Sequence, residues 1–167
     1  MKKTTTSLEQ RLVFRLQVLS RLSSSWLAQI YKPIFGLSVP QWHTLSIIGR
    51  FAPISPKNIS DISTMNAFNV SRNLSKLEDQ DWIFRQISSQ DKRQNELTLT
   101  KSGQEVYDQI ELIVQTLEEK LNEVLTDSER KNLGNILDKL EPHYREVVSS
   151  HSWADHLISK INDSKLK

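Results

Sequence analysis

The N-terminal stretch of the chain has the spacing of an amphipathic helix. From about Ser7 to Lys32, apolar residues recur every three or four positions, which places them on one helix face: Leu8, Leu12, Leu16, Leu19, Leu22 (or Ser23), Trp26 and Ile30. Ser7 is suited to cap the start, and Pro33 is expected to stop the helix near its end. Such a helix is about 37 Å long, more than the core of a small domain covers. Its apolar face is therefore expected to need a partner.

Three shorter helices are predicted next, over about residues 40–51, 57–64 and 67–80. A tight turn at Met65–Asn66 joins the last two, and the last has Val70, Leu74 and Leu77 on its inward side. Two short helices joined in this way are typical of a helix-turn-helix.

A β-hairpin is predicted after these helices. Residues 82–87 are aromatic and β-branched, and residues 96–99 alternate polar with apolar side chains. The polar residues 88–95 between them form the expected loop. A hairpin in this place is the wing of a winged helix-turn-helix.

Helices are predicted for the rest of the chain. Thr100 is suited to cap one long helix, and a second follows with Pro142 inside it, which predicts a kink. The tail, residues 151–167, has the spacing of one more short helix.

The order of these elements predicts a mainly α fold with a small β-hairpin wing. We expect a single domain over residues 1–167, with a winged helix-turn-helix for DNA binding at residues 37–103. Long dimerisation helices are expected at residues 7–34 and 104–167.

Composition excludes several kinds of chemistry. The 167 residues include no cysteine, which rules out disulfides, thiolate metal sites and cysteine nucleophiles. There is no glycine-rich phosphate loop, nucleophile elbow or paired-histidine motif, so we predict no enzyme, no cofactor and no metal site. No apolar run approaches the ~18 residues of a membrane span, and charges interrupt the N-terminal apolar stretch, so a cytoplasmic protein is expected.

The net charge of +2 is unevenly distributed. Residues 1–50 hold seven Lys or Arg and one Glu, a net charge of +6, whereas residues 102–167 have a net charge of −5. This asymmetry favours a polyanion as partner on one side of the molecule, the alternative being ordinary solvated helix faces.

The predicted helix at residues 67–80 has an outer side suited to the major groove of DNA. Such a helix needs short polar and basic side chains there. Its outer and flanking faces are expected to present Asn69, Ser71, Arg72, Asn73, Ser75 and Lys76. Arg72 is suited to bidentate bonds with guanine, whereas Lys76 is better suited to phosphates.

The predicted hairpin loop contains Asp91, Lys92 and Arg93. Arg93 is suited to a narrow minor groove, where A·T-rich sequence concentrates negative potential. Asp91 is placed to orient that guanidinium or the hairpin through a salt bridge. The alternative is an ordinary charged hairpin beside a solvated polar helix.

The same region resembles the MarR family of bacterial transcription regulators. The motifs that match are Asp91-x-Arg93-x-x-x-Leu97-x-Leu99-Thr100-x-x-Gly103, Val70-Ser71-Arg72-x-x-Ser75-x-Leu77-Glu78, Trp82-Ile83-x-Arg85 and Leu37-Ser38-x-x-Gln41-Trp42-x-x-Leu45. The resemblance covers about residues 8–148 and leaves residues 149–167 outside it. The sequence differs from the family at Asp81, where a glycine is usual. Because Asp tolerates a left-handed backbone, we expect this turn to form.

The resemblance implies a homodimeric repressor that leaves a palindromic operator when a small effector binds between the dimerisation helices and the winged domain. We expect an aromatic acid, as for hydroxycinnamate-type repressors, since a planar anion needs an apolar slot and an arginine. The candidate residues are Arg15, Arg21, Trp26, Gln41, Trp42 and His43.

Two alternatives to this interpretation stay open. The aromatic candidates for effector binding are also suited to the core, with the arginines solvated. A different class of function is a winged helix that binds protein rather than DNA, with the acidic C-terminal helices as its docking surface.

Overall fold

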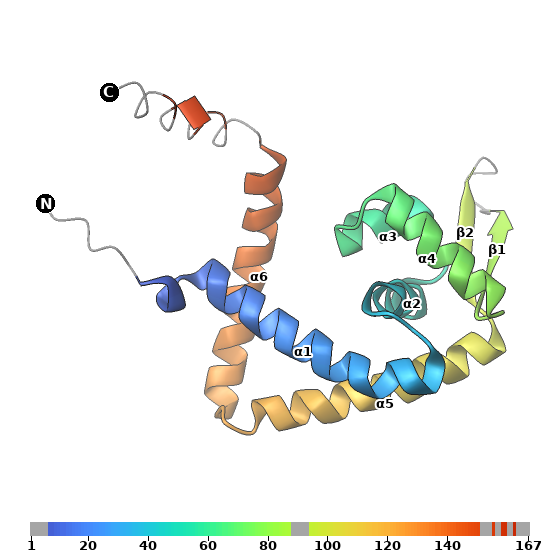
Figure 1. Cartoon of the computed structure of the whole chain (residues 1–167), viewed down its shortest axis with the longest axis horizontal. Coiled ribbons are helices and arrows are strands. Elements are labelled where there is room, and N and C mark those ends of the chain that lie inside the picture. The colour runs from blue at the N-terminus through green and yellow to red at the C-terminus, as the bar shows by residue number, and fades with distance from the viewer. Residues whose placement is uncertain (1–6, 88–93, 151–154, 156–157, 160–161, 163–167) are drawn as a thin grey trace, which may run out of the picture. The chain divides into compact units, whose positions relative to one another are not determined.

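Helices and one β-hairpin make up the structure, a computed structural model that describes residues 7–87, 94–150, 155, 158–159 and 162. In chain order its elements are η1 (Leu8–Gln10), α1 (Leu12–Phe35), α2 (Val39–Phe51), α3 (Pro56–Ser63), α4 (Ala67–Asp79), β1 (Ile83–Ile87), β2 (Asn95–Leu99), α5 (Lys101–Asn122) and α6 (Asp127–Ser149) (Figure 1). The mainly α fold with a two-stranded wing is confirmed. Over the described residues, no helix is long and apolar enough to cross a membrane.

The chain divides into two compact units, Met1–Leu117 and Glu118–Lys167. The first contains the helices and strands from α1 to β2 and the larger part of α5. The second contains the end of α5 and all of α6.

The first long helix begins and ends later than its pattern predicts. Ser7 precedes only the single 3-10 turn η1, and α1 starts at Leu12. Pro33 lies inside α1 because its missing N–H costs only one bond of the last turn. The helix ends at Gly36, whose left-handed φ of 70° and 2.8 Å bond from its N–H to the Lys32 carbonyl make the cap.

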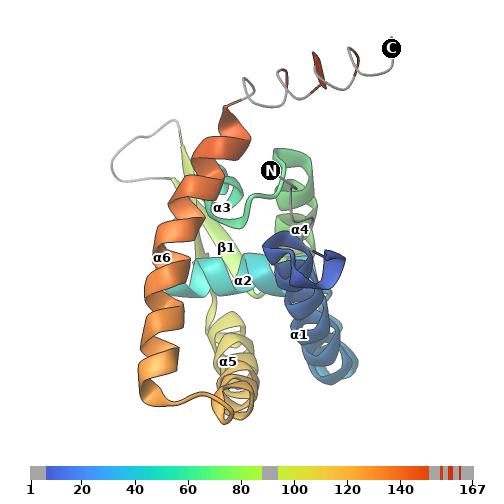
Figure 2. The same ribbon diagram turned by 90° about the vertical axis from the view of Figure 1, so that its left-hand side faces the viewer.

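The core of the first unit surrounds α2. Both views place α3 and α4 on one side of α2 and the first turns of α5 on the other (Figures 1 and 2). The largest fully buried side chains come from all of these elements, among them Tyr31, Leu45, Ile48, Ile59, Leu74, Leu77, Leu97 and Ile110. This packing fixes α4 to the rest of the unit.

Three aromatic rings join α1, α2 and α5 within this core. The Trp42 ring lies 6.3 Å from that of Tyr31 and is stacked at 5.9 Å on that of Tyr107, between ring centroids. Gly49 leaves room for the Tyr107 ring, since a Cβ there would lie 2.7 Å from it.

The turn between α4 and β1 forms as expected around Asp81. This residue has a left-handed φ of 57°, and its N–H donates to the Glu78 carbonyl at 2.9 Å. The hydroxyls of Thr100 and Ser102 donate to the Asp81 carbonyl at 2.6 and 2.7 Å. The start of α5 therefore holds a turn at a position where the MarR motif usually has glycine.

Gly103 lies in close contact with the same turn. A Cβ at Gly103 would come 1.8 Å from the Trp82 carbonyl oxygen. The Gly103 N–H donates to the Thr100 hydroxyl at 3.0 Å. These contacts give a physical reason for the threonine and glycine of the wing motif.

The hairpin is antiparallel and is joined to the helices by a further backbone pairing. Ile83 lies opposite Leu99, and Ile87 lies opposite Asn95. Between α2 and α3, the Ile54 N–H donates to the Leu97 carbonyl at 3.2 Å, and the Leu97 N–H donates to the Ile54 carbonyl at 2.9 Å. The wing is thereby fixed beside the helix-turn-helix.

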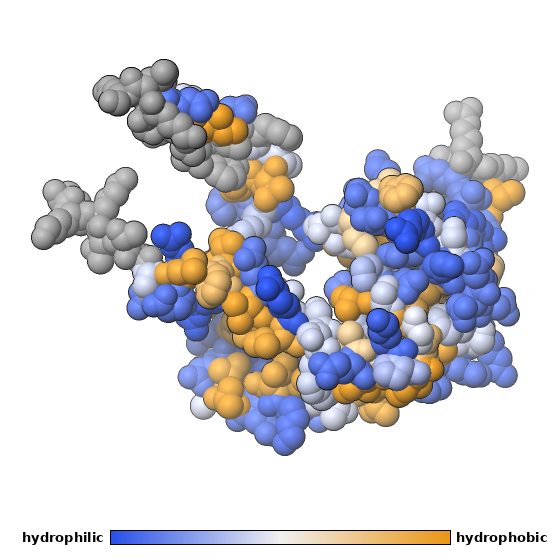
Figure 3. All heavy atoms as spheres, viewed as in Figure 1, coloured by the Kyte–Doolittle hydropathy of each residue, from blue (hydrophilic) through white to orange (hydrophobic). Residues whose placement is uncertain are grey.

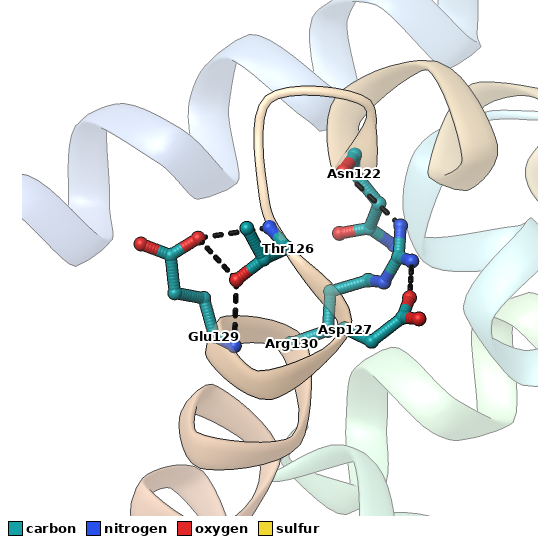
Figure 4. A network of polar contacts seen from close by, with 5 residues as sticks. All are labelled: Asn122, Thr126, Asp127, Glu129 and Arg130. Carbon is teal, nitrogen blue, oxygen red and sulfur yellow. Dashed lines mark hydrogen bonds and ion pairs between the residues drawn. The ribbon is translucent and has the colours of Figure 1, made fainter.

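In the second unit, α6 begins with a capping box (Figure 4). The Glu129 carboxylate accepts bonds from the Thr126 N–H at 2.8 Å and the Thr126 hydroxyl at 2.7 Å, while that hydroxyl accepts from the Glu129 N–H at 3.3 Å. Arg130 donates to the Asn122 carbonyl at 3.3 Å and pairs with Asp127. The bonds from Thr126 favour the ionised carboxylate and lower the pKa of Glu129.

Candidate nucleic-acid interface

Helix α4 buries one side and exposes a polar one. Val70, Leu74 and Leu77 are buried, as predicted. The exposed residues include most of the predicted set, namely Asn69, Ser71, Arg72, Ser75 and Lys76. With the helical repeat of about 100° per residue, Arg72 and Ser75 lie directly opposite the buried side.

Phe68 shares this outer face and was not predicted to belong to it. Its side chain is 70% exposed, one helical turn before Arg72. Phe68 lies four residues before Arg72, and residues four apart share a helix face. This spacing could have predicted the exposed position of Phe68.

The prediction that Asn73 lies on the DNA-facing surface is wrong. Its side chain is only 8% exposed. The Asn73 Nδ2 donates to the Pro40 carbonyl at 3.1 Å and to the Thr44 hydroxyl at 3.0 Å. The Thr44 hydroxyl in turn donates to the Pro40 carbonyl at 2.9 Å. Asn73 therefore joins α4 to α2 and fixes the angle at which the exposed face is presented.

The start of α4 is capped by a side chain. The Asn66 side-chain oxygen accepts from the Asn69 N–H at 2.8 Å, and Thr64 reverses the chain just before it with a left-handed φ of 58°. Ser71 and Arg72 follow on a helix that is ordered from its first turn.

Further basic side chains lie beside α4. Arg85 of β1 pairs with Glu78 of α4, which ties the wing to that helix. Two surface hollows of about 310 and 290 Å³ are each lined by Lys57 and Arg85, and Ser71 also lines the second. Lys57 is exposed at the start of α3. No periodic pattern marks Lys57, because its position depends on how α3 packs against the wing.

Asp91, Lys92 and Arg93 lie outside the described residues. Their DNA contacts stay predictions, as does a helix over the tail at 151–167, most of which is also outside them.

Comparison with known proteins shows which proteins share this arrangement of α4 and the wing. Residues 37–94 match the model of the MarR family. The chain is similar to a MarR/EmrR family transcriptional regulator from Acinetobacter sp. ADP1, with 26% identity and a TM-score of 0.76 over 84% of this chain and 99% of the other. Residues 37–94 therefore form a MarR-family region. The chain is also 28% identical to the HTH-type transcriptional regulator YwoH of Bacillus subtilis (strain 168) over 102 residues, 61% of this chain and 74% of that protein.

The MarR fold extends beyond the winged region. A mutant of E. coli MarR complexed with operator DNA has the same fold at 24% identity, with a TM-score of 0.68 over 78% of this chain and 94% of the other. The MarR-family match confirms the resemblance predicted from the wing motif, while the aromatic-acid subtype stays a prediction.

Two of the predicted effector residues have structural roles in the first unit. The Gln41 side-chain oxygen accepts from the Ser38 N–H and from the Ser38 hydroxyl, both at 2.8 Å, as part of the capping box of α2. Trp42 is 5% exposed within the aromatic cluster of the core. Gln41 also lines a hollow of about 140 Å³ with Leu37 and Trp82, so effector binding by Gln41 and Trp42 stays a prediction.

The other four predicted effector residues are exposed. Arg15, Arg21 and Trp26 lie on α1 and His43 lies on α2, where partial desolvation lowers the pKa of its imidazole. Arg21 lines a hollow of about 390 Å³ on the surface of α1, together with Phe14, Gln17, Val18, Leu22 and Ser25. Neither Arg15 nor His43 lines this hollow.

Proposed function

We propose that this MarR-family transcriptional regulator is a homodimeric repressor that binds a palindromic DNA operator through the outer face of α4. The observation that supports it most is that face itself, on which Ser71, Arg72, Ser75 and Lys76 are exposed. The buried side of the same helix is fixed by the core and by Asn73. A rigid helix with such a face suits the major groove.

Arg72 and Lys76 have different roles in this proposal. Arg72 lies in the middle of the outer face and forms bidentate bonds to a guanine. Lys76 binds phosphate, because a flexible point charge carries little base information. Lys76 also forms an ion pair with Asp79, at 4.0 Å between two largely exposed side chains. Such an exposed pair is too weak to prevent Lys76 from binding phosphate. Arg93 is proposed to enter the adjacent minor groove.

The proposed dimer buries apolar surface that a single chain leaves exposed. Figure 3 shows apolar atoms, in orange, gathered along α1. The large apolar side chains exposed on this helix are Leu12, Val13, Phe14, Val18, Leu19, Leu22, Trp26 and Ile34. In the second unit, α6 exposes Leu133, Ile136, Leu137, Tyr144 and Val148. Helices with such long apolar faces are covered by a second copy of the chain in a symmetric dimer.

Two-fold symmetry of the protein predicts an operator of the same symmetry. Each α4 enters the major groove of one half-site, so the half-sites are about 10 bp apart. Such an operator is an imperfect palindrome.

We further propose a small aromatic carboxylate as the effector. The hollow on α1 supports this chemistry, because Phe14, Val18 and Leu22 provide apolar contacts while Arg21 is suited to the carboxylate. The ligand releases DNA by favouring a spacing of the two α4 helices that misfits the operator. Titration with hydroxybenzoates should lower operator affinity about 5–150-fold, the range of typical coupling energies. Arg21→Ala should abolish that response and leave operator binding intact, whereas no response to any of these acids at millimolar concentration would contradict this effector class.

Selection from a random pool of DNA duplexes tests the function. The full chain should enrich an inverted repeat, and its affinity for that repeat should exceed its affinity for a scrambled duplex about 10³-fold or more at fixed salt. Binding without any enriched sequence would contradict the proposal.

A further inference from the structure

The most exposed aromatic side chain near the proposed DNA-binding face is Phe68. It is 70% exposed, although it lies only two residues from the fully buried Val70. It is the second residue of α4, directly after the first position of the helix at Ala67. The core therefore does not account for a phenylalanine here.

The neighbours of Phe68 show what kind of surface it completes. Arg72 lies one turn further along the same face, and Asn69 and Ser71 flank it, all three exposed. In a helix-turn-helix the N-terminal residues of the second helix contact base edges. A large apolar group therefore lies at the N-terminal end of an otherwise polar helix face.

We propose that Phe68 contacts the C5-methyl group of a thymine and selects thymine at one position of each half-site. This inference rests on the proposed DNA-binding function of α4. Among the four bases, only thymine presents an apolar group in the major groove, and a phenyl ring is suited to it. Burial of that methyl against the ring removes apolar surface from water on both molecules.

The position of this thymine follows from the helix. Residues four apart on a helix are separated by about 6 Å along its axis, and successive bases are about 3.4 Å apart. Phe68 therefore contacts a base about two steps from the guanine that Arg72 binds.

The test replaces thymine by deoxyuridine at each position of the selected duplex. This change removes only the C5-methyl group and keeps the hydrogen-bonding groups of the base. At one position per half-site, the substitution should weaken binding of the unaltered protein about fourfold, the value of one buried methyl. Phe68→Ala should bind the thymine duplex more weakly and should not distinguish thymine from deoxyuridine at that position.

Phe51→Ala is the matched control, because it removes another exposed phenylalanine, at the end of α2. It should keep the full preference for thymine, and Phe68→Leu should keep part of it. If the unaltered protein selects a sequence but Phe68→Ala keeps the same preference for thymine over deoxyuridine, this inference is overturned. The proposed function would still stand. An equal loss of affinity on thymine and deoxyuridine duplexes would also overturn the inference. Failure of the unaltered protein to select any sequence would instead contradict the proposed function.

Discussion

Gly103 is a position at which a single methyl group should disturb the fold. The Trp82 carbonyl oxygen would lie 1.8 Å from a Cβ at Gly103, so the backbone has to move in Gly103→Ala. We expect the free energy of unfolding to fall by about 1–3 kcal/mol or more, the cost of overpacking. Urea unfolding monitored by tryptophan fluorescence measures this change.

Gly134→Ala is the control for that substitution. Apart from its neighbours along α6, no atom of the described residues lies within 4 Å of a Cβ at Gly134, so this change should stabilise the helix by up to about 1 kcal/mol. Similar effects of the two substitutions would show that the close approach at Gly103 is not a constraint.

At the scale of residues, the sequence predicts exposure well where it depends on a single helix. The period of α4 places Val70, Leu74 and Leu77 inward. Asn73 lies three residues after Val70 and four before Leu77, so the same period places it inward. Its polar amide was assigned outward because its partner, Thr44, lies 29 positions earlier in the chain. The prediction also leaves out Phe68, since an apolar side chain on a short helix is usually assigned to the core.

The structural role of Gln41 has a local signal in the sequence, whereas that of Trp42 has none. Ser38-x-x-Gln41 has the spacing of a capping box, in which the glutamine bonds back to the cap residue. That spacing predicts a capping role for Gln41, whereas its effector role stays a prediction. The burial of Trp42 depends instead on Tyr31 and Tyr107 from two other helices, which no local pattern shows.

At the scale of elements, patterns predict which helices and strands exist better than where they end. The two-residue alternation of β2 and the apolar periodicity of α4 both find their elements. The end of α1 was misplaced because Pro33 is tolerated in the last turn, and the glycine that ends the helix lies three residues later.

The start of α6 allows a direct test of helix capping. Thr126→Ala removes the hydroxyl that accepts from the Glu129 N–H. The first turn of α6 should lose about 1 kcal/mol of local stability, which speeds hydrogen exchange of its amides about fivefold. Thr126→Ser keeps the hydroxyl and should exchange at nearly the original rate. Unchanged exchange in Thr126→Ala would mean that this cap does not hold the helix.

The same cap should weaken in acid. The pKa of Glu129 is lowered in the folded chain, so its contribution is complete above the ordinary value of 4.5. That contribution is lost as the pH falls through the lowered pKa. Exchange of the α6 first-turn amides, corrected for intrinsic rates, should show this loss at the acid end, and Glu129→Gln should remove the pH dependence.

At the scale of the whole molecule, the proposed dimer follows from the long apolar face of α1. The sequence predicts this face, since its spacing makes a helix longer than a small core covers, and the structure finds Leu12, Leu19 and Leu22 exposed on it. A single chain does not show which surface covers it.

Sedimentation at low micromolar concentration should give a particle of about 39 kDa, twice the 19.4 kDa of one chain. Leu22→Glu places a charge on the apolar face of α1 and should shift the population towards 19.4 kDa. Phe51→Glu, an exposed apolar position away from α1, should leave the dimer intact. A monomer that still binds the selected duplex tightly would contradict the dimer.

The central claim is that the outer face of α4 recognises DNA sequence. The most direct test compares the binding affinities of Arg72→Ala and Lys76→Ala. Both variants are measured on the selected duplex and on its single-base variants, over a series of salt concentrations. Arg72→Ala should lose about 1–3 kcal/mol per half-site and relax the preference at one base pair. Lys76→Ala should weaken binding to all sequences alike and reduce the slope of log affinity against log salt by about one per bound lysine. Equal loss on every sequence in both variants, or no loss in either, would contradict the assignment of α4 to the major groove.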